Sequence, residues 1–373
     1  MFIVFTLVGI SIILVAEFFY LKNLVPRAFA FWSLDLSKKG VKAARIIVTV
    51  TLLFCSVLVF SIVGMAVLHF LAISAIVDLL CLVIRLISKK NPQGLKFISS
   101  SCIVPVILCA IVIVYGYVNM HNVIKTEYTV DIQKDLSREY KVAFVSDIHT
   151  GISLNNEKIQ KMCEEINAQR PDILLLGGDI VDESTTKEEM KNVFLQLSKI
   201  KSTYGTYFVF GNHDTMKFGQ SAKDSFTKEE LESTITSLGI TVLTDDTVSI
   251  GDEILLLGRL DASFRGDNQE KRASLDAITK GLDKEKTWLL LDHQPREYDI
   301  SKSVGIDLEI SGHTHGGQIW PAGLVTTLIA PNEMNYGYKS DGSFHAIVSS
   351  DVASWGFPIK TAKPCEYLIV TIK

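Results

Sequence analysis

Cysteine is scarce in this chain, and its distribution argues against cysteine-based sites. Four of the six cysteines lie in long apolar runs, where a thiol acts as a small hydrophobic side chain: Cys55, Cys81, Cys102 and Cys109. The other two, Cys163 and Cys365, are far apart and belong to no Cys-x-x-Cys pair. Neither a disulfide framework nor a cysteine-rich metal site is therefore expected.

Basic residues are outnumbered by acidic residues in the second part of the chain. Residues 1–120 contain ten lysines and arginines and three acids, whereas residues 121–373 contain 27 and 38. Nucleic acid needs a basic surface, so it is not expected as a general partner. A single phosphate held by metal ions remains compatible with an acidic domain, because the local charge of the ions outweighs the global charge.

Charged residues are rare within the first 120 residues, which predicts a multi-pass membrane region. The stretch 1–20 has neither a basic start nor a small-residue cleavage site, which favours an uncleaved helix over a signal peptide. The apolar run 46–84 is too long for one span of about 20 residues and predicts two spans joined by a tight turn. Four helices are expected, at 1–21, 46–66, 67–85 and 99–120, followed by a polar linker at 121–140.

The basic residues of this region lie in two loops between the predicted spans. The loops contain Lys22, Arg27, Lys38, Lys39, Lys42 and Arg45, and then Arg85, Lys89, Lys90 and Lys96. The positive-inside rule places both loops in the cytoplasm and residue 121 onward on the outer face of the cell membrane. If 46–84 crossed only once, that domain would face the cytoplasm. Glu17, His69 and Asp78 suggest either an ion path or helix contacts, and we favour contacts.

From residue 141 to 373, short apolar runs alternate with amphipathic helices, the pattern of an α/β domain. Strands are expected at 141–145, 172–176, 207–210, 254–258, 287–291, 307–310, 345–349 and 366–372. One helix, capped by Asn155 or Asn156, has the apolar face Ile159, Met162, Cys163 and Ile166. A second helix has the face Met190, Val193, Phe194 and Leu197.

Five of these strands end in residues that bind metals well. The residues are Asp147 and His149, Asp179 and Asp182, Asn212 with His213 and Asp214, His293, and finally His313 and His315. Each motif alone is typical of a turn or a helix cap. Together they place five of the eight histidines at strand ends. Ligands of α/β sheets bind beyond the carboxyl ends of strands, so the five segments are expected to converge on one site.

In this order, D-x-H, G-D-x-x-D, G-N-H-D, a later histidine and G-H-x-H resemble the calcineurin-like metallophosphoesterases. The resemblance covers about residues 139–373. The fuller GHTHGGQ and the element formed by Trp355, Gly356 and Pro358 are similar to the membrane-associated bacterial branch, which includes proteins acting on phospholipid-like or nucleotide-linked lipid substrates. The fold that the resemblance implies is a four-layer α/β-β/α sandwich.

The resemblance also implies a role for each residue of the motifs. One metal ion would be held by Asp147, His149 and His315, the other by Asn212, His293 and His313, and Asp179 would bridge both. His213 would contact the substrate phosphate or protonate the leaving oxygen, with Asp214 orienting it. Asp182 would support the ligand loops. The segment SSDVASWG at 349–356 is less glycine-rich than expected of this branch, which bears on the shape of the substrate pocket.

The residue types suit this chemistry. Asp147 and His149 are two apart, so on an extended segment both side chains point to the same side. Oxygen and imidazole ligands without thiolate predict manganese, with iron or zinc as alternatives, since magnesium and calcium prefer oxygen alone. Two ions about 3.5–4 Å apart clamp a phosphate and activate a water that attacks phosphorus. The glycines of GHTHGG are explained by a backbone that approaches the ions and substrate closely.

We therefore expect a membrane-anchored, dinuclear-metal phosphoesterase that hydrolyses phosphomono- or phosphodiesters, with a lipid-linked or membrane-proximal substrate. An extracytoplasmic nucleotide phosphodiesterase is the alternative within the enzyme class. A non-catalytic membrane sensor with this fold would be expected to have lost a ligand, and none is lost. A transporter or scaffold would need several paired intramembrane charges, which are scarce.

Overall fold

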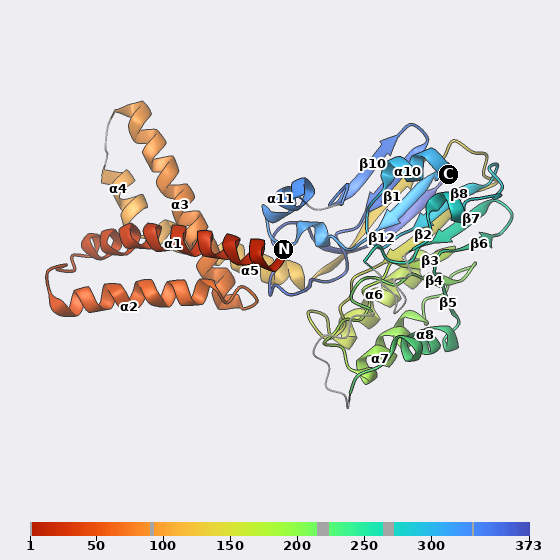
Figure 1. Cartoon of the computed structure of the whole chain (residues 1–373), viewed down its shortest axis with the longest axis horizontal. Helices are drawn as coiled ribbons and strands as arrows, with labels where there is room; N and C mark the ends of the chain where they lie inside the picture. The colour runs from red at the N-terminus through yellow and green to blue at the C-terminus, as the bar shows by residue number, and fades with distance from the viewer. Residues whose placement is uncertain (1, 90–92, 215–223, 264–271, 330–331) are drawn as a thin grey trace. The chain divides into compact units, whose positions relative to one another are not determined.

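The computed structural model describes residues 2–89, 93–214, 224–263, 272–329 and 332–373 (Figure 1). It divides into two compact units. The first comprises residues 1–117 with 356–358, and the second comprises residues 118–355 with 359–373.

The first unit is helical. Its helices are α1 (Phe2–Phe31), α2 (Lys39–Ser56), α3 (Ile62–Ser88), α4 (Gln93–Ser100) and the greater part of α5 (Ile103–Met120). The break between α2 and α3 lies at residues 57–61, whereas the sequence analysis placed it between 66 and 67. Ser61 caps α3 by accepting a hydrogen bond from the Gly64 amide, and a Cβ on Gly64 would collide with the Leu58 carbonyl. This close turn explains the earlier start of α3.

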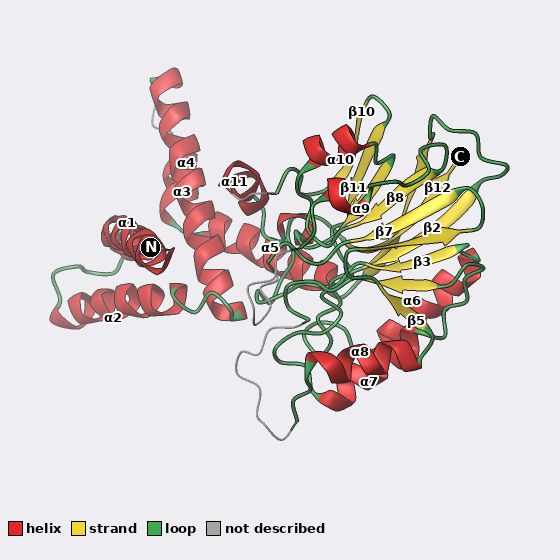
Figure 2. Ribbon diagram, turned by 45° about the vertical axis from the view of Figure 1, so that its right-hand side comes forward, coloured by secondary structure: helices red, strands yellow, loops and turns green. Residues whose placement is uncertain are grey.

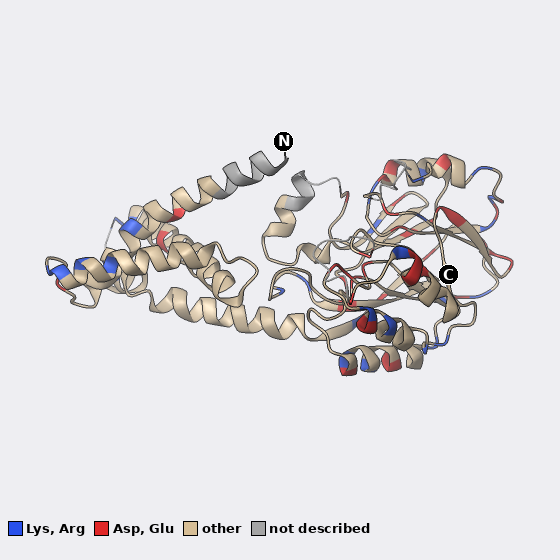
Figure 3. Ribbon diagram, turned by 60° about the horizontal axis from the view of Figure 1, so that its bottom comes forward, with Lys and Arg blue, Asp and Glu red and all other residues tan. Residues whose placement is uncertain are grey.

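Two of the described helices are long and apolar enough to cross a membrane. They are α3, with a mean hydropathy of 2.6, and α5, with 2.3. Charged side chains are few along the helices of this unit and frequent in the other (Figure 3). Of the four predicted spans, these two are supported by length and composition, and the others stay predictions.

The acidic residues among the helices of the first unit are paired. Asp78 accepts hydrogen bonds from Arg27 at 2.6 Å and from the Tyr20 hydroxyl at 2.9 Å. Glu17 accepts one from the Ser56 hydroxyl at 2.6 Å. These contacts join α1 to α3 and α2, as expected for charges that hold helices together.

The second unit contains two six-stranded sheets, which are seen nearly side-on in Figure 2. The first sheet has the order β1-β12-β2-β3-β4-β5 and the second has the order β10-β11-β9-β8-β7-β6. The strands of the first are β1 (Val123–Val130), β2 (Tyr140–Val145), β3 (Ile173–Leu176), β4 (Thr206–Phe208), β5 (Ile240–Val242) and β12 (Cys365–Ile372). Those of the second are β6 (Asp246–Ile250), β7 (Ile254–Gly258), β8 (Thr287–Leu291), β9 (Leu308–Ser311), β10 (Gly337–Asp341) and β11 (Phe344–Val348).

Three apolar cores define the layers of this unit. Side chains of both sheets meet in one core, for example Phe144 and Leu175 with Leu289 and Ile310. The other face of the first sheet packs on α6 (Asn156–Gln169), α7 (Lys187–Leu197) and α8 (Lys228–Ser237). The other face of the second sheet packs on the short helices α9 (Leu275–Ile278) and α10 (Tyr298–Val304). The α/β-β/α layering is therefore confirmed.

The two helices predicted from apolar periodicity are confirmed as α6 and α7. The Asn155 side chain caps α6 by accepting a hydrogen bond from the Lys158 amide, and all four residues of its predicted apolar face are buried. The predicted linker at 121–140, by contrast, contains β1, which pairs in parallel with β12 from Val123 to Val130. This strand lies at the edge of the sheet, and many of its side chains are polar and face solvent. Its sequence therefore lacks the apolar pattern that predicts a buried strand.

Parallel pairing brings the informative strand ends together. Strands β2, β3 and β4 run in parallel in the first sheet, as do β7, β8, β9 and β11 in the second. The segments that follow their carboxyl ends carry the metal-type residues, so the fold collects these residues at one edge of the sandwich.

Candidate metal centre

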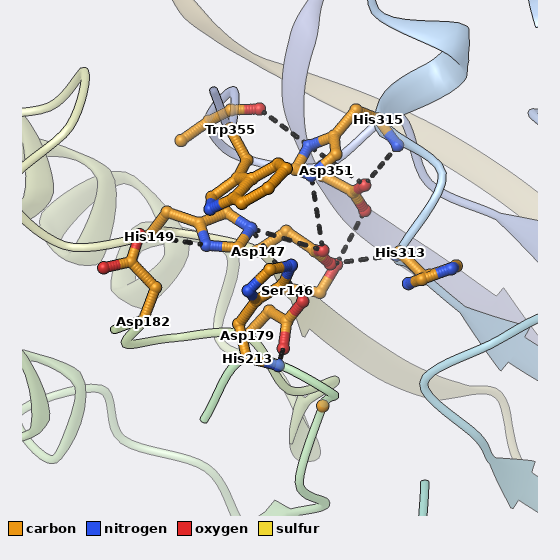
Figure 4. A network of polar contacts seen from close by, with 12 residues as sticks. Ser146, Asp147, His149, Asp179, Asp182, His213, His313, His315, Asp351 and Trp355 are labelled. Atoms are coloured by element: carbon orange, nitrogen blue, oxygen red, sulfur yellow. Dashed lines mark hydrogen bonds and ion pairs between the residues drawn. The ribbon is translucent and has the colours of Figure 1, made fainter. Parts of the chain in front are cut away.

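Two groups of buried side chains lie at the carboxyl ends of the strands. The first group is Asp147, His149 and His315, and the second is Asp179, His293 and His313. Within each group the potential ligand atoms all lie within 4.8 Å of one another. Figure 4 shows Asp147, His149 and His315 of the first group close together, with Asp179 beside them. The structure thus brings six of the seven predicted metal ligands together in two groups, and their roles as ligands stay predictions.

Asp179 connects the two groups. Its Oδ2 lies 3.3 Å from Nε2 of His293 in its own group and 3.9 Å from Nε2 of His149 in the other. The Asn212 Oδ1 lies 3.2 Å from the same His293 nitrogen. A carboxylate in this position can serve both groups, and the Asn212 oxygen lies beside the second group.

The backbone at these ligands is left-handed, not extended. Positive φ occurs at Asp147 (54°), His149 (43°), Asp179 (50°), His313 (73°) and His315 (50°). This corrects the expectation that Asp147 and His149 share a side because their segment is extended. Such φ values are costly for residues other than glycine and are concentrated at functional sites. The chain turns sharply where each strand ends, and this turn aims the side chains inward.

The glycines of these loops allow backbone segments to approach the ligand carboxylates. A Cβ on Gly312 would collide with the Ser146 hydroxyl and with the Asp147 carboxylate. A Cβ on Gly211 would collide with Asp179 in the same way. Glycine is therefore required at these two positions by the close approach of the neighbouring atoms.

Three ligand histidines are oriented by a contact to the opposite ring nitrogen. Nδ1 of His293 lies 2.8 Å from the Gly177 carbonyl, and Nδ1 of His315 lies 3.3 Å from the Ala353 carbonyl. Nδ1 of His149 lies 3.5 Å from Oδ2 of Asp182. Contacts of this kind leave Nε2 free to bind a metal ion and hold the ring in place.

The electrostatics of the site favour a cation. Burial, together with the charges of Asp351 and Asp179, raises the pKa of Asp147 well above its ordinary value. Burial alone would lower the pKa of His293, but Asp179 and Asp147 raise it well above the usual range. Burial and the neighbouring His293 lower the pKa of His313 to about 3, so this imidazole is neutral, as a metal ligand must be.

Unsatisfied buried atoms point in the same direction. Asp147 Oδ1 and His149 Nε2 are buried and have no hydrogen-bond partner among the described residues. Such atoms cost free energy unless something else binds them. The oxygen and imidazole donors present here fit divalent manganese, iron or zinc.

Asp214 does not orient His213, which corrects the role expected for it. Its carboxylate accepts hydrogen bonds from the amides of Asp179 and Gly211, both at 2.7 Å, and from Val181 at 3.2 Å. It therefore braces the ligand loops. The carboxylate that contacts His213 is Glu183, whose Oε2 lies 2.8 Å from Nδ1 of the ring.

Trp355 covers the other side of His213. The two ring centroids are 4.5 Å apart, with 38° between the planes. Figure 4 shows Trp355 beside His149 and His213. In the sequence, Trp355 is recognisable only as part of a motif. Glu183 was not predicted, because nothing in the residues around it indicates that it contacts His213.

The segment after β11 supports the GHTHGG loop. Asp351 accepts hydrogen bonds from the His315 amide at 2.8 Å and from the Ser146 hydroxyl at 2.9 Å. The buried Lys360 ammonium donates to the carbonyls of Ser350, Asp351 and Ala353. The sequence of residues 349–356 departs from the family pattern in its low glycine content. In the structure, Asp351 of this segment contacts the backbone of His315, a predicted ligand.

With this geometry established, comparison with known proteins identifies the domain. Residues 140–317 match the family model of calcineurin-like phosphoesterases. These residues form a calcineurin-like phosphoesterase domain. An uncharacterized metallophosphoesterase of Helicobacter pylori is 34% identical over 232 residues, which are 62% of this chain and 59% of that protein. The chain thus covers less than two thirds of the length of this relative.

Two further relatives extend the likeness beyond the phosphoesterase domain. An uncharacterized metallophosphoesterase of Campylobacter jejuni is 27% identical over 302 residues, 79% of this chain and 76% of that protein. A zebrafish (Danio rerio) protein described as a transmembrane protein with metallophosphoesterase domain is 25% identical over 287 residues, 73% of this chain and 62% of that protein.

Proposed function

We propose that this protein is a membrane-associated, metal-dependent phosphoesterase. The observation that carries the proposal is the pair of buried ligand groups joined by Asp179. Asp147, His149 and His315 would hold one divalent ion and Asn212, His293 and His313 the other. Ions bound there would supply Lewis-acid chemistry, which polarises phosphate oxygens and activates water.

His213 is the residue proposed to act on the substrate directly. Its amide donates to Asp179 Oδ1 at 2.7 Å, which keeps the residue next to the ligand groups. Because Nδ1 contacts the Glu183 carboxylate, Nε2 is the ring nitrogen that would contact a phosphate or leaving-group oxygen, and it would donate a proton when the ring carries both protons. Trp355 limits the rotation of the ring and excludes water from its face.

The proposed substrate is a phosphoester whose phosphate lies close to a lipid bilayer. Two observations support it: α5 is one of the helices able to cross a membrane, and only two residues separate its end at Met120 from the start of β1 at Val123. The catalytic domain thus follows an apolar helix with almost no linker. The zebrafish relative is itself described as a transmembrane protein.

The proposal is tested by hydrolysis assays on the manganese-loaded full-length protein with a chromogenic phosphomonoester and a chromogenic phosphodiester. We expect activity on at least one, a loss of at least about a hundredfold in kcat in Asp179→Ala, and a loss of roughly 10²–10⁴-fold in His213→Ala. Asp252→Ala, which removes an exposed carboxylate in a turn, is the control and should retain full activity.

Equal rates for the wild type and Asp179→Ala on both substrates would refute the enzyme proposal. In that case a sensory protein that keeps the fold and binds metal ions without catalysis would be the better interpretation.

A further inference from the structure

A cluster of exposed apolar side chains follows the GHTHGG loop. Trp320, Leu324 and Val325 lie within six residues and are 63%, 66% and 52% exposed. Trp320 precedes α11 (Ala322–Ile329), and Leu324 and Val325 lie on it. Isolated exposed apolar residues are common, but a contiguous group marks a surface that binds something apolar.

A cavity of about 330 Å³ lies beside this cluster, and Trp320 and Leu324 contribute to its lining. Gly316 also lines it, and this residue follows His315 of the first ligand group directly. The volume lies at the low end of the range for ligand sites, about 300–1,000 Å³. The cavity is therefore large enough for part of a ligand whose reacting group is bound at the metal centre.

Glycine contacts hold the cavity walls against the metal loop. A Cβ on Gly323 of α11 would lie 3.0 Å from the Cα of Gly317, so only glycine allows this approach. A Cβ on Gly316 would lie 2.7 Å from the Cβ of Lys363 on the opposite wall. The apolar helix and the metal-binding loop are thus in direct contact.

The walls combine apolar surface with one positive charge. The Lys363 ammonium lies 4.8 Å from the centroid of the Tyr336 ring, and both residues line the cavity. The other lining side chains include Trp320, Pro321 and Leu324. An apolar pocket with a single cation at its wall suits a hydrocarbon chain that is attached to an anionic group.

The same wall is bonded to the end of α5. Residues 118–120 belong to the second unit, and the Asn119 amide donates to the carbonyls of Lys360 and Lys363, both at 2.9 Å. The Cys365 thiol lies 3.5 Å from the Met120 carbonyl. If α5 spans a bilayer, the cavity lies next to the point where the chain leaves it.

From these observations we infer that the cavity between α11 and the Tyr336–Lys363 wall binds the first methylenes of an alkyl or acyl chain whose phosphate reacts at the metal centre. The inference rests on the proposed phosphoesterase function and assigns it a substrate class, phosphoesters with an aliphatic chain. Trp320 and Leu324 would contact the chain, and the Lys363 ammonium would lie on the side of the phosphate.

The test uses the manganese-loaded full-length protein in amphipol without free detergent, so that no other alkyl chain competes. The substrates are 4-nitrophenyl methyl phosphate and 4-nitrophenyl hexyl phosphate, kept below their aggregation concentrations. Each buried methylene changes binding by roughly fourfold. We expect kcat/KM to be at least about tenfold higher for the hexyl ester, and calorimetry to show a similar preference for hexylphosphonate over methylphosphonate.

Two variants on α11 test whether the preference for the hexyl compounds comes from the cavity. Leu324→Ser should reduce the hexyl preference severalfold in both measurements, because it removes an apolar side chain that would contact the alkyl chain. Val325→Ser is the matched control, because Val325 is exposed on the same helix but does not line the cavity. Equal kcat/KM and equal binding for the methyl and hexyl compounds would overturn the inference, as would an equal loss of preference in both variants.

Further outcomes distinguish a chain-binding cavity from a surface that binds the bilayer and from failure of the proposed function. If Leu324→Ser changed activity only on esters embedded in vesicles, the apolar cluster would bind the bilayer surface and the chain-binding cavity would be refuted. If neither ester were hydrolysed, the calorimetric comparison of the two phosphonates would decide for or against the cavity, and the proposed function would fail only if the chromogenic phosphomonoester were not hydrolysed either. Hydrolysis without any dependence on chain length would contradict the cavity alone.

Discussion

His213 lies between two side chains that act on different parts of its ring. Glu183 contacts Nδ1 at 2.8 Å, and Trp355 lies against the ring at a centroid distance of 4.5 Å. A carboxylate accepts a hydrogen bond from the imidazole nitrogen that it contacts. It therefore keeps a proton on that nitrogen, here Nδ1, and holds the ring in one orientation. The positioning residue for His213 is therefore Glu183, which follows the G-D-x-x-D motif.

Replacing Glu183 by glutamine is expected to lower kcat by about ten- to a hundredfold with little change in KM, which is less than the loss in His213→Ala. Glutamine keeps an oxygen at hydrogen-bond distance but removes the charge. Steady-state kinetics on the better chromogenic substrate measure the effect. Glu188→Gln, an exposed change nearby on α7, should leave both constants unchanged. A wild-type kcat in Glu183→Gln would rule out this role.

At the scale of elements, the support of the metal centre comes from the segment between β11 and β12. Asp351 in this segment binds the His315 amide, and Lys360 binds three carbonyls around it. Both side chains are fully buried, so their charges depend on hydrogen-bond partners such as these. The segment thus acts as a brace for the GHTHGG loop.

Lys360→Met is expected to destabilise the protein, because it leaves these carbonyls without their donor. One hydrogen bond to a charged group contributes about 1.5–3 kcal/mol, and the desolvation cost of the buried ammonium offsets part of the three bonds, so a net loss of about one bond should lower Tm by roughly 3–10 °C. Thermal unfolding of the full-length variant measures this change. Lys161→Met, on the exposed face of α6, is the control, with an expected shift of no more than about 1 °C. An unchanged Tm in Lys360→Met would show that the brace is not needed.

For the whole molecule, the predicted side of the membrane for the phosphoesterase domain depends on one helix and one loop. Arg85, Lys89 and Lys96 lie between the apolar stretches of α3 and α5, and Lys90 of the same basic loop lies outside the described residues. The positive-inside rule favours the cytoplasm for this loop. If α5 crosses the membrane, the domain that follows is then extracytoplasmic, whether two or four helices span.

We therefore predict that a reporter fused after Lys373 is active if it requires the outer side and inactive if it requires the cytoplasm. The same reporters fused after Lys89 should give the opposite result, because this residue belongs to the basic loop. Comparing enzymatic and fluorescent reporters at both positions measures sidedness directly. Cytoplasmic activity at Lys373 would refute the extracytoplasmic placement.

Local sequence was sufficient for the elements with strong periodicity and for the chemistry of the strand ends. Buried strand β3 consists of apolar residues alone, β8 has four apolar residues after Thr287, and the apolar spacing of α6 matches one helical face. Edge strand β1 was not predicted, because many of its residues are polar and it is a strand through its pairing with β12. The α2–α3 break was misplaced because the whole region is apolar and the turn depends on a close backbone contact at Gly64.

Tertiary structure alone decided which side chains meet. The motifs identify Asp147, Asp179 and the five histidines as a set, since the ligand type is a property of each residue. Their distances depend on the left-handed turns at the strand ends and on the parallel order of the strands. The partners Glu183 and Asp351, and the cavity beside Gly316, join segments that are distant in sequence. Such contacts arise from packing, which no single segment encodes.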